Sequence, residues 1–306
     1  MVKDLKHLLD NPLPTDTGFF DINHYIKHSP RVEDYDLRAK FGQWRETGVV
    51  VFENAVPEEM IAGLLADVEY LCENRKTFDL EVECQGRRYR LRDVPVHPLS
   101  VPGVKFNCLD LISMAARRLS LNRIVHDFLG HVFLDRPAVL QSLTFWRGSQ
   151  QPAHLDYPYV CVQSRIPHLA ASWIALEDTH EDAGPLAYYP GSHKAGVIAP
   201  FDWGGGSVIN TPESTRTPME FAFYLSGQIE KLSLRPEVFL PKRGDALIWH
   251  GNLLHEGTKI RDPARTRRSF VTHYTSRRSY TNDHYFIGAQ EPGAVRLPSW
   301  GATAVG

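Results

Sequence analysis

Two His-x-Asp triplets in the sequence can each place an imidazole and a carboxylate on the same side of the chain. The first, His154-Leu155-Asp156, follows residues with strand and hairpin character and leads into the segment YPYV. On an extended strand, residues i and i+2 face the same side. The sequence therefore predicts that His154 and Asp156 point together into the interior of a β-structure.

The second triplet, His180-Glu181-Asp182, has a different setting. It lies within the turn-like segment EDTHEDAGP, where neighbouring side chains share no fixed direction. We therefore do not expect this triplet to form a functional site.

Two histidines and one carboxylate on one face of an octahedron are the ligand set of non-haem Fe(II) oxygenases, which leaves three coordination positions open. With His154 and Asp156 as two ligands, a second histidine must come from elsewhere. His255 is the best candidate because it follows the apolar segment ALIW and a Gly-Asn turn. The alternatives are His250, His193 and His273. His250 and His255 are expected to face opposite sides of one continuous strand, so only one of them would serve.

An arginine downstream of His255 suits the binding of a carboxylate. Arg267 lies in the segment TRRSFVTHY. A strand that returned beside the one carrying His255 would place Arg267 deep in the same cavity. A guanidinium group binds a carboxylate through two parallel hydrogen bonds. The distal carboxylate of 2-oxoglutarate would fit such a site.

Two helical patterns and a series of short strands are expected to position these residues. The helices cover residues 57–75, where apolar residues recur at helical spacing, and residues 111–129. The strands cover residues 48–52, 138–146, 168–178, 244–251 and 269–276. Short strands separated by turns favour a sandwich or barrel. We predict a single α+β domain with a mainly β core.

We expect the domain to span residues 1–306, with three less regular parts. Residues 1–43 are predicted to form an N-terminal arm of extended chain or short helices on the surface. Residues 196–235 contain three consecutive glycines, several prolines and many aromatic residues, and a long insertion of this kind is typical of a lid over a functional site. Residues 277–306 are predicted to be a C-terminal tail.

Over residues 44 to 276 the sequence resembles the phytanoyl-CoA dioxygenase family of Fe(II)/2-oxoglutarate oxygenases, which includes ectoine hydroxylase. The resemblance depends on ordered segments: GVVVFENAVPEEM, QSLTFW before the first triplet, SWIALED, AGPLAYYPGSHK, GDALIWHGNLLHEG and TRRSFVTHY. It implies a double-stranded β-helix, a cupin-like jelly roll of eight strands. It also implies that iron binds to His154, Asp156 and His255.

The resemblance further implies that Arg267 holds the distal carboxylate of 2-oxoglutarate, and that Gln141 and Trp173 line the cosubstrate pocket. Family members often carry a serine two residues after the distal histidine, where this chain has Gly257. The gap to the arginine is also one residue longer than usual, so Arg268 remains an alternative to Arg267.

The function implied by the resemblance is a 2-oxoglutarate-dependent dioxygenase that uses Fe(II), 2-oxoglutarate and O2. It would hydroxylate an unactivated C–H bond of a small metabolite or biosynthetic intermediate and release succinate and CO2. Because related halogenases lack the carboxylate ligand, Asp156 favours hydroxylation over chlorination. Desaturation, cyclisation and epimerisation remain alternatives. A non-catalytic cupin-fold binding protein and a metal enzyme that does not use 2-oxoglutarate are alternatives of other classes.

Composition narrows the range of partners. With 34 Lys and Arg against 36 Asp and Glu, the net charge is -2, which argues against a general nucleic-acid binder. Residues 259–278 nevertheless hold seven basic residues and one acidic residue. That segment can attract an anionic small molecule. We expect no membrane partner, and the four widely spaced cysteines suggest reduced thiols in a cytoplasmic protein. The oligomeric state is not predicted.

Overall fold

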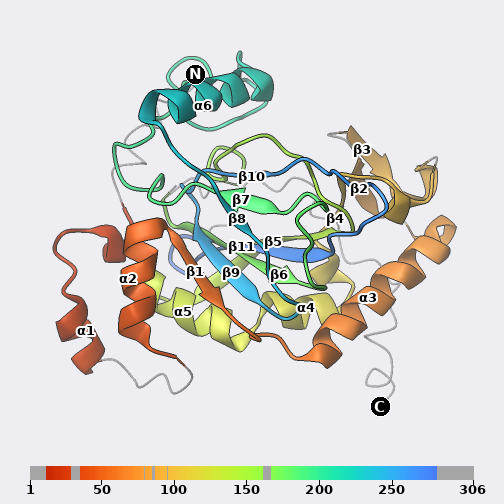
Figure 1. Ribbon diagram of the computed structural model, residues 1–306, viewed down its shortest axis with the longest axis horizontal. Coiled ribbons are helices and arrows are strands. Elements are labelled where there is room, and N and C mark those ends of the chain that lie inside the picture. Colours follow the sequence, from red (N-terminus) through yellow and green to blue (C-terminus); the bar gives the residue numbers. More distant parts are fainter. Residues whose placement is uncertain are drawn as a thin grey trace.

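Two antiparallel β-sheets form the centre of the molecule, and helices cover one face of the larger sheet (Figure 1). The computed structural model describes residues 12–28, 35–78, 80–84, 87–94, 96–160 and 167–280. The larger sheet contains, in spatial order, β1 (Val49–Phe52), β9 (Ala246–His250), β6 (Leu169–Ala175), β11 (Ser269–Ser276), β5 (Pro137–Phe145), β4 (Val104–Asn107), β2 (Glu81–Cys84) and β3 (Arg87–Arg90). The smaller sheet contains β10 (His255–Gly257), β7 (Leu186–Tyr188) and β8 (Glu237–Phe239).

This architecture confirms the predicted α+β class with a jelly-roll β core. The jelly roll was expected to have eight strands, whereas the larger sheet alone has eight and the smaller sheet adds three. The expected strands are present as β1, β5, β6, β9 and β11, each within a few residues of its predicted bounds.

The central strands are buried because both faces of the larger sheet are covered. Every residue of β6, β9 and β11 is buried. On β9, Ala246 and Ile248 belong to the hydrophobic cluster shared with the helices. The alternate residues Leu247 and Trp249 belong to a second cluster on the side of the smaller sheet. The period of two along a strand thus separates a helix-facing side from an inner side.

Six α-helices within the described residues frame the sheets (Figure 1). They are α1 (Ile22–His28), α2 (Leu37–Thr47), α3 (Glu58–Glu73), α4 (Met114–Ser120), α5 (Arg123–Phe133) and α6 (Pro218–Leu232). Short 3-10 helices lie at Pro14–Asp16, Arg75–Thr77, Leu91–Asp93, Pro98–Ser100 and Leu109–Leu111. The helix predicted at residues 57–75 is confirmed as α3. Its apolar positions Ile61, Leu64, Leu65, Val68 and Leu71 are all buried.

The single helix predicted at residues 111–129 is wrong, because the structure has two helices there, α4 and α5. The chain breaks at Asn122, whose side chain accepts a hydrogen bond from the backbone N–H of Val125 at 3.2 Å and so caps α5. The same side chain donates to the carbonyl of Ala55 at 3.1 Å. A capping asparagine competes with helix continuation, and the apolar periodicity alone did not reveal it.

The parts outside the motifs also have defined structure. The N-terminal arm, residues 1–43, was expected on the surface, but it includes the start of α2, where Phe41 is fully buried. Trp44, just after the arm on the same helix, is also fully buried. Within residues 196–235, Phe201 and Trp203 join α6 in a separate hydrophobic cluster. A lid function for this insertion remains a prediction. Residues 281–306 of the predicted tail lie outside the described residues.

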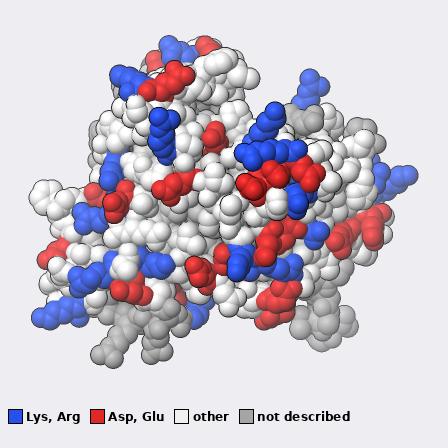
Figure 2. Space-filling model, in the orientation of Figure 1, with Lys and Arg blue, Asp and Glu red and all other residues white. Residues whose placement is uncertain are grey.

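Four of the seven basic residues at 259–278 form ion pairs with acidic residues, most of which belong to other segments. Figure 2 shows Lys, Arg, Asp and Glu side chains intermingled on the visible face. The ion pairs are Arg261 with Asp182 and Glu181, Arg265 with Asp262, Arg268 with Glu177, and Arg278 with Asp135. The excess positive charge seen in the sequence therefore does not form an open cationic patch. Surface attraction of an anion by this segment is weaker than the sequence indicated.

Two further observations concern membrane-spanning helices and the cysteine thiols. Of the helices in the described ranges, none combines the length and apolar character needed to cross a membrane. Cys72, Cys84 and Cys108 are free thiols, and Cys161 lies outside the described residues. Burial raises the pKa of Cys72 and Cys108 to about 12, so these thiols are poor nucleophiles.

We expect Asn122→Ala to destabilise the fold by about 2–3 kcal/mol, because it removes a helix cap and leaves the Ala55 carbonyl without its partner. Thr217→Ala removes only the exposed cap of α6 and should cost about 1 kcal/mol. Urea denaturation of both variants measures the difference. Equal losses would show that the Asn122–Ala55 hydrogen bond does not stabilise the junction.

Candidate metal centre

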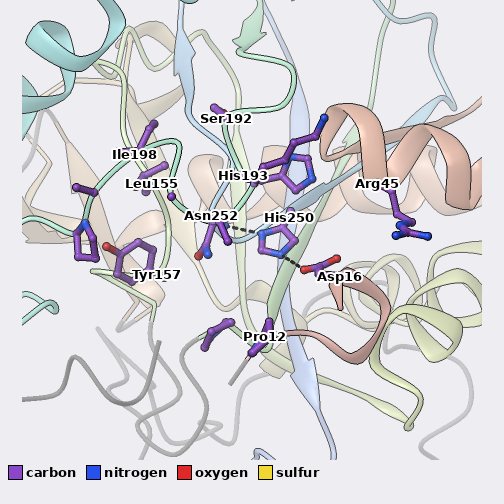
Figure 3. A pocket seen from close by; sticks show the side chains of 16 residues that line it. Pro12, Asp16, Arg45, Leu155, Tyr157, Ser192, His193, Ile198, His250 and Asn252 are labelled. Atoms are coloured by element: carbon purple, nitrogen blue, oxygen red, sulfur yellow. Dashed lines mark hydrogen bonds and ion pairs between the residues drawn. The ribbon is translucent and has the colours of Figure 1, made fainter. Parts of the chain in front are cut away.

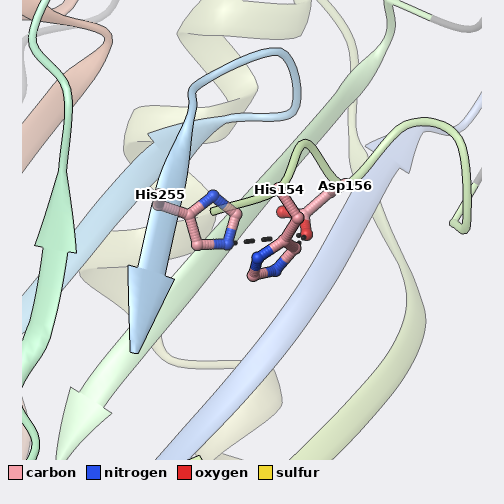
Figure 4. Close-up of side chains that lie close together, drawn as sticks. All are labelled: His154, Asp156 and His255. Atoms are coloured by element: carbon pink, nitrogen blue, oxygen red, sulfur yellow. Dashed lines mark ion pairs between the residues drawn. The ribbon is translucent and has the colours of Figure 1, made fainter. Parts of the chain in front are cut away.

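His154 and His255 are held opposite each other by a backbone bridge between two segments that are distant in the sequence. The His154 N–H donates to the His255 carbonyl at 2.9 Å, and the His255 N–H donates to the His154 carbonyl at 3.1 Å. The triplet does not form a strand, because His154 takes part only in this isolated bridge and Asp156 lies in a bend. The predicted common direction of the two side chains is nevertheless observed (Figure 4).

The three side chains converge on one point. His154, Asp156 and His255 each offer one ligand atom, and these atoms lie within 4.8 Å of one another. Nε2 of His154 lies 3.9 Å from Oδ1 of Asp156, and Nε2 of His255 lies 3.6 Å from the same oxygen. Both separations are shorter than twice a typical metal–nitrogen bond of about 2.1 Å. One ion can thus contact all three atoms.

Backbone carbonyls set the tautomers of both histidines. Nδ1 of His154 lies 2.9 Å from the carbonyl of Pro152, and Nδ1 of His255 lies 2.9 Å from the carbonyl of Leu253. A carbonyl only accepts, so each Nδ1 must carry the proton and donate it. Each Nε2 then keeps its lone pair for a metal ion.

Asp156 is oriented by donors on its other oxygen. The indole N–H of Trp249 donates to Oδ2 at 2.7 Å. Nε2 of His273 lies 3.4 Å from Oδ2, and Nδ1 of His273 accepts from the amide of Gln141 at 3.2 Å. Because Oδ2 faces protein donors and Oδ1 faces the two histidines, the geometry favours binding of a metal ion through Oδ1 alone.

Burial and mutual charge keep the ligands in the protonation states that bind a metal. Burial, aided by the neighbouring His255, lowers the pKa of His154 to about 3. Burial by itself raises the pKa of Asp156, but the imidazoles of His255, His273 and His154 outweigh it and lower that pKa below its ordinary value. A neutral imidazole beside an ionised carboxylate is the state that a divalent ion requires.

Arg267 lines the same cavity as the three ligands, whereas Arg268 does not. The Arg267 side chain is 2% exposed, and its guanidinium lies 5.7 Å from the ring centre of Phe145 and 5.6 Å from that of Trp173. Its Nε has no hydrogen-bond partner in the described part of the chain, and burial lowers the pKa of Arg267 to about 10. Arg268 is paired with Glu177 at 3.2 Å and lies over Trp146.

The route by which Arg267 reaches the cavity differs from the prediction. It precedes β11, whose neighbours are β5 and β6 in the larger sheet, whereas His255 begins β10 in the smaller sheet. Arg267 therefore approaches from the opposite sheet and not from a strand beside His255. The two sheets enclose the site between them.

The other sequence candidates have distinct positions. Trp173 lines the metal cavity, but Gln141 is not among its lining residues and contacts His273 instead. Of the alternative histidines, His273 lies beside Asp156, while His250 and His193 line a different cavity. His180 and Asp182 of the second triplet lie 3.6 Å apart on the surface, away from the metal cavity.

Packing explains the glycine at position 257. A Cβ atom there would lie 2.5 Å from the hydroxyl oxygen of Ser149, so no side chain fits without displacement of its neighbours. Ser149 itself lines the metal cavity with Arg267. Sequence reasoning missed both Ser149 and Trp249. The alternation along β9 could have identified Trp249, since it places that residue on the side facing away from His250.

We expect Trp249→Phe to weaken divalent-metal binding by about 10- to 100-fold, because Asp156 loses its strongest orienting donor. Anaerobic titration with Mn²⁺ measures the affinity. Trp203→Phe is the matched control, since Trp203 is fully buried in the cluster around α6. Unchanged affinity in Trp249→Phe would show that the indole does not orient the carboxylate.

Comparisons with known proteins identify the fold and the family of the chain. "Phytanoyl-CoA dioxygenase domain-containing protein 1" of Danio rerio is 25% identical over 143 residues, which cover 45% of this chain and 45% of that protein. The match thus spans less than half of that relative. The structure of EctD from S. alaskensis with 2-oxoglutarate and 5-hydroxyectoine is 16% identical with a TM-score of 0.57, and the match covers 88% of this chain and 90% of that one.

A second similar structure is the epimerase SnoN from nogalamycin biosynthesis, in complex with Fe3+, alpha ketoglutarate and nogalamycin RO. It is 15% identical with a TM-score of 0.55, and the match covers 78% of this chain and 83% of that one. At these identities the likeness establishes the jelly-roll fold. The model of the family described as phytanoyl-CoA dioxygenase (PhyH) matches residues 44–269. The chain belongs to the phytanoyl-CoA dioxygenase family.

Proposed function

We propose that this protein is an Fe(II)- and 2-oxoglutarate-dependent dioxygenase that hydroxylates an unactivated C–H bond of a small metabolite or biosynthetic intermediate. The observation that carries the proposal is the arrangement of three ligand atoms around one point. One ligand atom from each of His154, Asp156 and His255 lies within 4.8 Å of the others, and hydrogen bonds occupy Nδ1 of both histidines and Oδ2 of Asp156. Two histidines and one carboxylate suit Fe(II) with open positions.

When bound, iron and 2-oxoglutarate would supply the oxidising chemistry, with 2-oxoglutarate converted to succinate and CO2. The residues of the chain bind and position. His154 and His255 present their Nε2 atoms, and Asp156 presents Oδ1. Trp249 and His273 restrain the carboxylate from rotating, because both face its second oxygen. Their role is to keep the remaining coordination positions open for cosubstrate and O2.

Arg267 is proposed to bind the distal carboxylate of 2-oxoglutarate. It is a buried cation in the metal cavity, and Phe145 and Trp173 flank its guanidinium. The nearby carboxylate of Glu177 forms its ion pair with Arg268 instead. A buried charge without a partner is costly, so an anionic ligand at this point would stabilise it. Ser149 lines the same cavity and provides a hydroxyl for a carboxylate oxygen. We propose no direct cosubstrate contact for Gln141, which contacts His273.

The carboxylate ligand favours hydroxylation over chlorination, and we propose hydroxylation as the outcome. The similar structures include an epimerase and a complex with 5-hydroxyectoine, so one fold supports different outcomes. Epimerisation, desaturation and cyclisation would use the same metal ligands. The substrate's position beside the metal would select among them.

Alanine at His154 or Asp156 should abolish succinate formation, because each removes one of three metal ligands. Succinate release from 2-oxoglutarate, with Fe(II) and ascorbate and a panel of candidate metabolites, measures the activity. Mass gain of one oxygen in a metabolite would identify the substrate. Full turnover by either variant would refute the metal assignment.

Arg267→Ala should raise KM for 2-oxoglutarate by about 10- to 100-fold, because it removes a charge-assisted hydrogen bond worth about 1.5–3 kcal/mol. Arg268→Ala is the matched control, since Arg268 is paired with Glu177 outside the cavity and should leave KM within about twofold. Similar KM values in wild type and Arg267→Ala would favour a metal enzyme that does not use 2-oxoglutarate.

A further inference from the structure

A second cavity lies next to the segment that carries His154 and Asp156 (Figure 3). Its volume is about 590 Å³, compared with about 70 Å³ for the metal cavity, and the two share no lining residue. Small-molecule sites usually have volumes of roughly 300–1,000 Å³. The cavity is therefore large enough for an organic ligand that does not touch the metal ligands.

Two segments of the chain, residues 154–156 and strand β9, each contribute adjacent residues to both cavities. Leu155 lines the second cavity, while His154 and Asp156 on either side of it line the metal cavity. On β9, His250 lines the second cavity and Trp249 lines the metal cavity. This alternation places a ligand of the second cavity against the reverse side of the metal centre.

The polar wall of the cavity holds one ionised group, the carboxylate of Asp16, and two imidazoles. The N–H of Asn252 donates to Nδ1 of His250 at 2.9 Å, so the proton of that imidazole resides on Nε2 and is donated to Oδ2 of Asp16 at 2.9 Å (Figure 3). Burial together with His250 lowers the pKa of His193 to about 3, which keeps this second imidazole uncharged. The carboxylate of Asp16 is thus already occupied by a donor.

One acceptor in this wall lacks a donor. Oδ1 of Asn252 is buried and has no hydrogen-bond partner within the described part of the chain. A buried polar atom of this kind costs about 1–3 kcal/mol unless a ligand or water satisfies it. Because this atom is shielded from the cavity by protein atoms, a ligand there does not reach it unless the Asn252 side chain moves.

Two cations lie at the exposed rim. Arg45, near the end of α2, and Lys194, after the PGSH turn, both line the cavity and both are solvent-exposed. Neither has a carboxylate within 4.0 Å among the described residues, in contrast to the paired arginines of residues 259–278. The apolar remainder of the wall includes Leu155, Ile198 and Pro200. Cations at the rim and apolar side chains inside suit an amphipathic anion.

We propose that this cavity binds an organic monocarboxylate with an apolar body. The carboxylate lies between Arg45 and Lys194, and the body contacts Leu155 and Ile198. The ligand is either part of the oxidised substrate or a separate effector, and the two share this chemistry. The binding itself does not depend on the proposed oxygenase function.

Calorimetric titration of the full chain with 3-phenylpropionate, indole-3-acetate and decanoate tests the proposal. At least one carboxylate should bind with Kd below about 1 mM, and its primary amide should bind about tenfold more weakly. Failure of all three carboxylates to bind, or equal binding of the amides, overturns the proposal.

Variants locate the binding. The double substitution Arg45→Gln and Lys194→Gln should weaken carboxylate binding by about tenfold and leave amide binding unchanged. Ile198→Glu should weaken both, because it places a charge against the apolar body. Arg267→Ala and Asp156→Ala are the controls, since both residues line the metal cavity. Loss of binding in these controls, with none in the rim variants, would assign the carboxylate to the metal cavity and overturn the proposal.

A final arm distinguishes the two sources of the ligand, and it alone rests on the proposed function. The bound carboxylate is incubated with the protein, Fe(II), 2-oxoglutarate and ascorbate in air. A mass gain of one oxygen identifies the cavity as part of the substrate site, whereas an unchanged carboxylate that still binds identifies an effector site. If no succinate forms under any condition, the proposed function fails while the calorimetric result still stands.

Discussion

The metal centre depends on one backbone bridge, the pair of hydrogen bonds between His154 and His255. The first residue belongs to an irregular segment after β5, and the second begins β10 of the smaller sheet. Neither segment has enough regular structure of its own to orient a side chain. The reciprocal bonds fix both backbones at one separation, and the two imidazoles then lie 4.2 Å apart between ring centres. Every other feature of the site adds to this frame.

Orientation within that frame comes from hydrogen bonds to the atoms that do not face the ion. Carbonyls of Pro152 and Leu253 hold the two imidazoles, and Trp249 holds the carboxylate. Each partner lies on the same segment as a ligand or on a central strand of the larger sheet. Rigid neighbours of this kind preorganise a ligand set before any ion binds. Burial strengthens the effect, because water cannot compete for the same atoms.

The fold also couples two cavities through shared segments. Leu155 and His250 face the larger cavity, and their chain neighbours His154, Asp156 and Trp249 face the metal. A ligand that displaced Leu155 would therefore act on the backbone that carries two metal ligands. The unpaired cations Arg45 and Lys194 at the rim of the larger cavity contrast with the arginines of residues 259–278, most of which are paired with acids. We therefore expect an anion to bind more tightly at the larger cavity than at residues 259–278.

The sequence by itself determined five strands of the larger sheet, the first long helix, the family resemblance and the identity of the residues that meet at the candidate metal centre. These follow from residue type and local periodicity, which are properties of neighbouring residues. Only the tertiary structure decided that Arg267 enters from the sheet opposite His255, that Asn122 divides a predicted helix, and that four of the seven basic residues at 259–278 are paired with acids. Each of these depends on partners far away in the chain, such as Ala55 for Asn122 and Glu177 for Arg268. Local patterns carry no information about such partners, because chain topology brings them together.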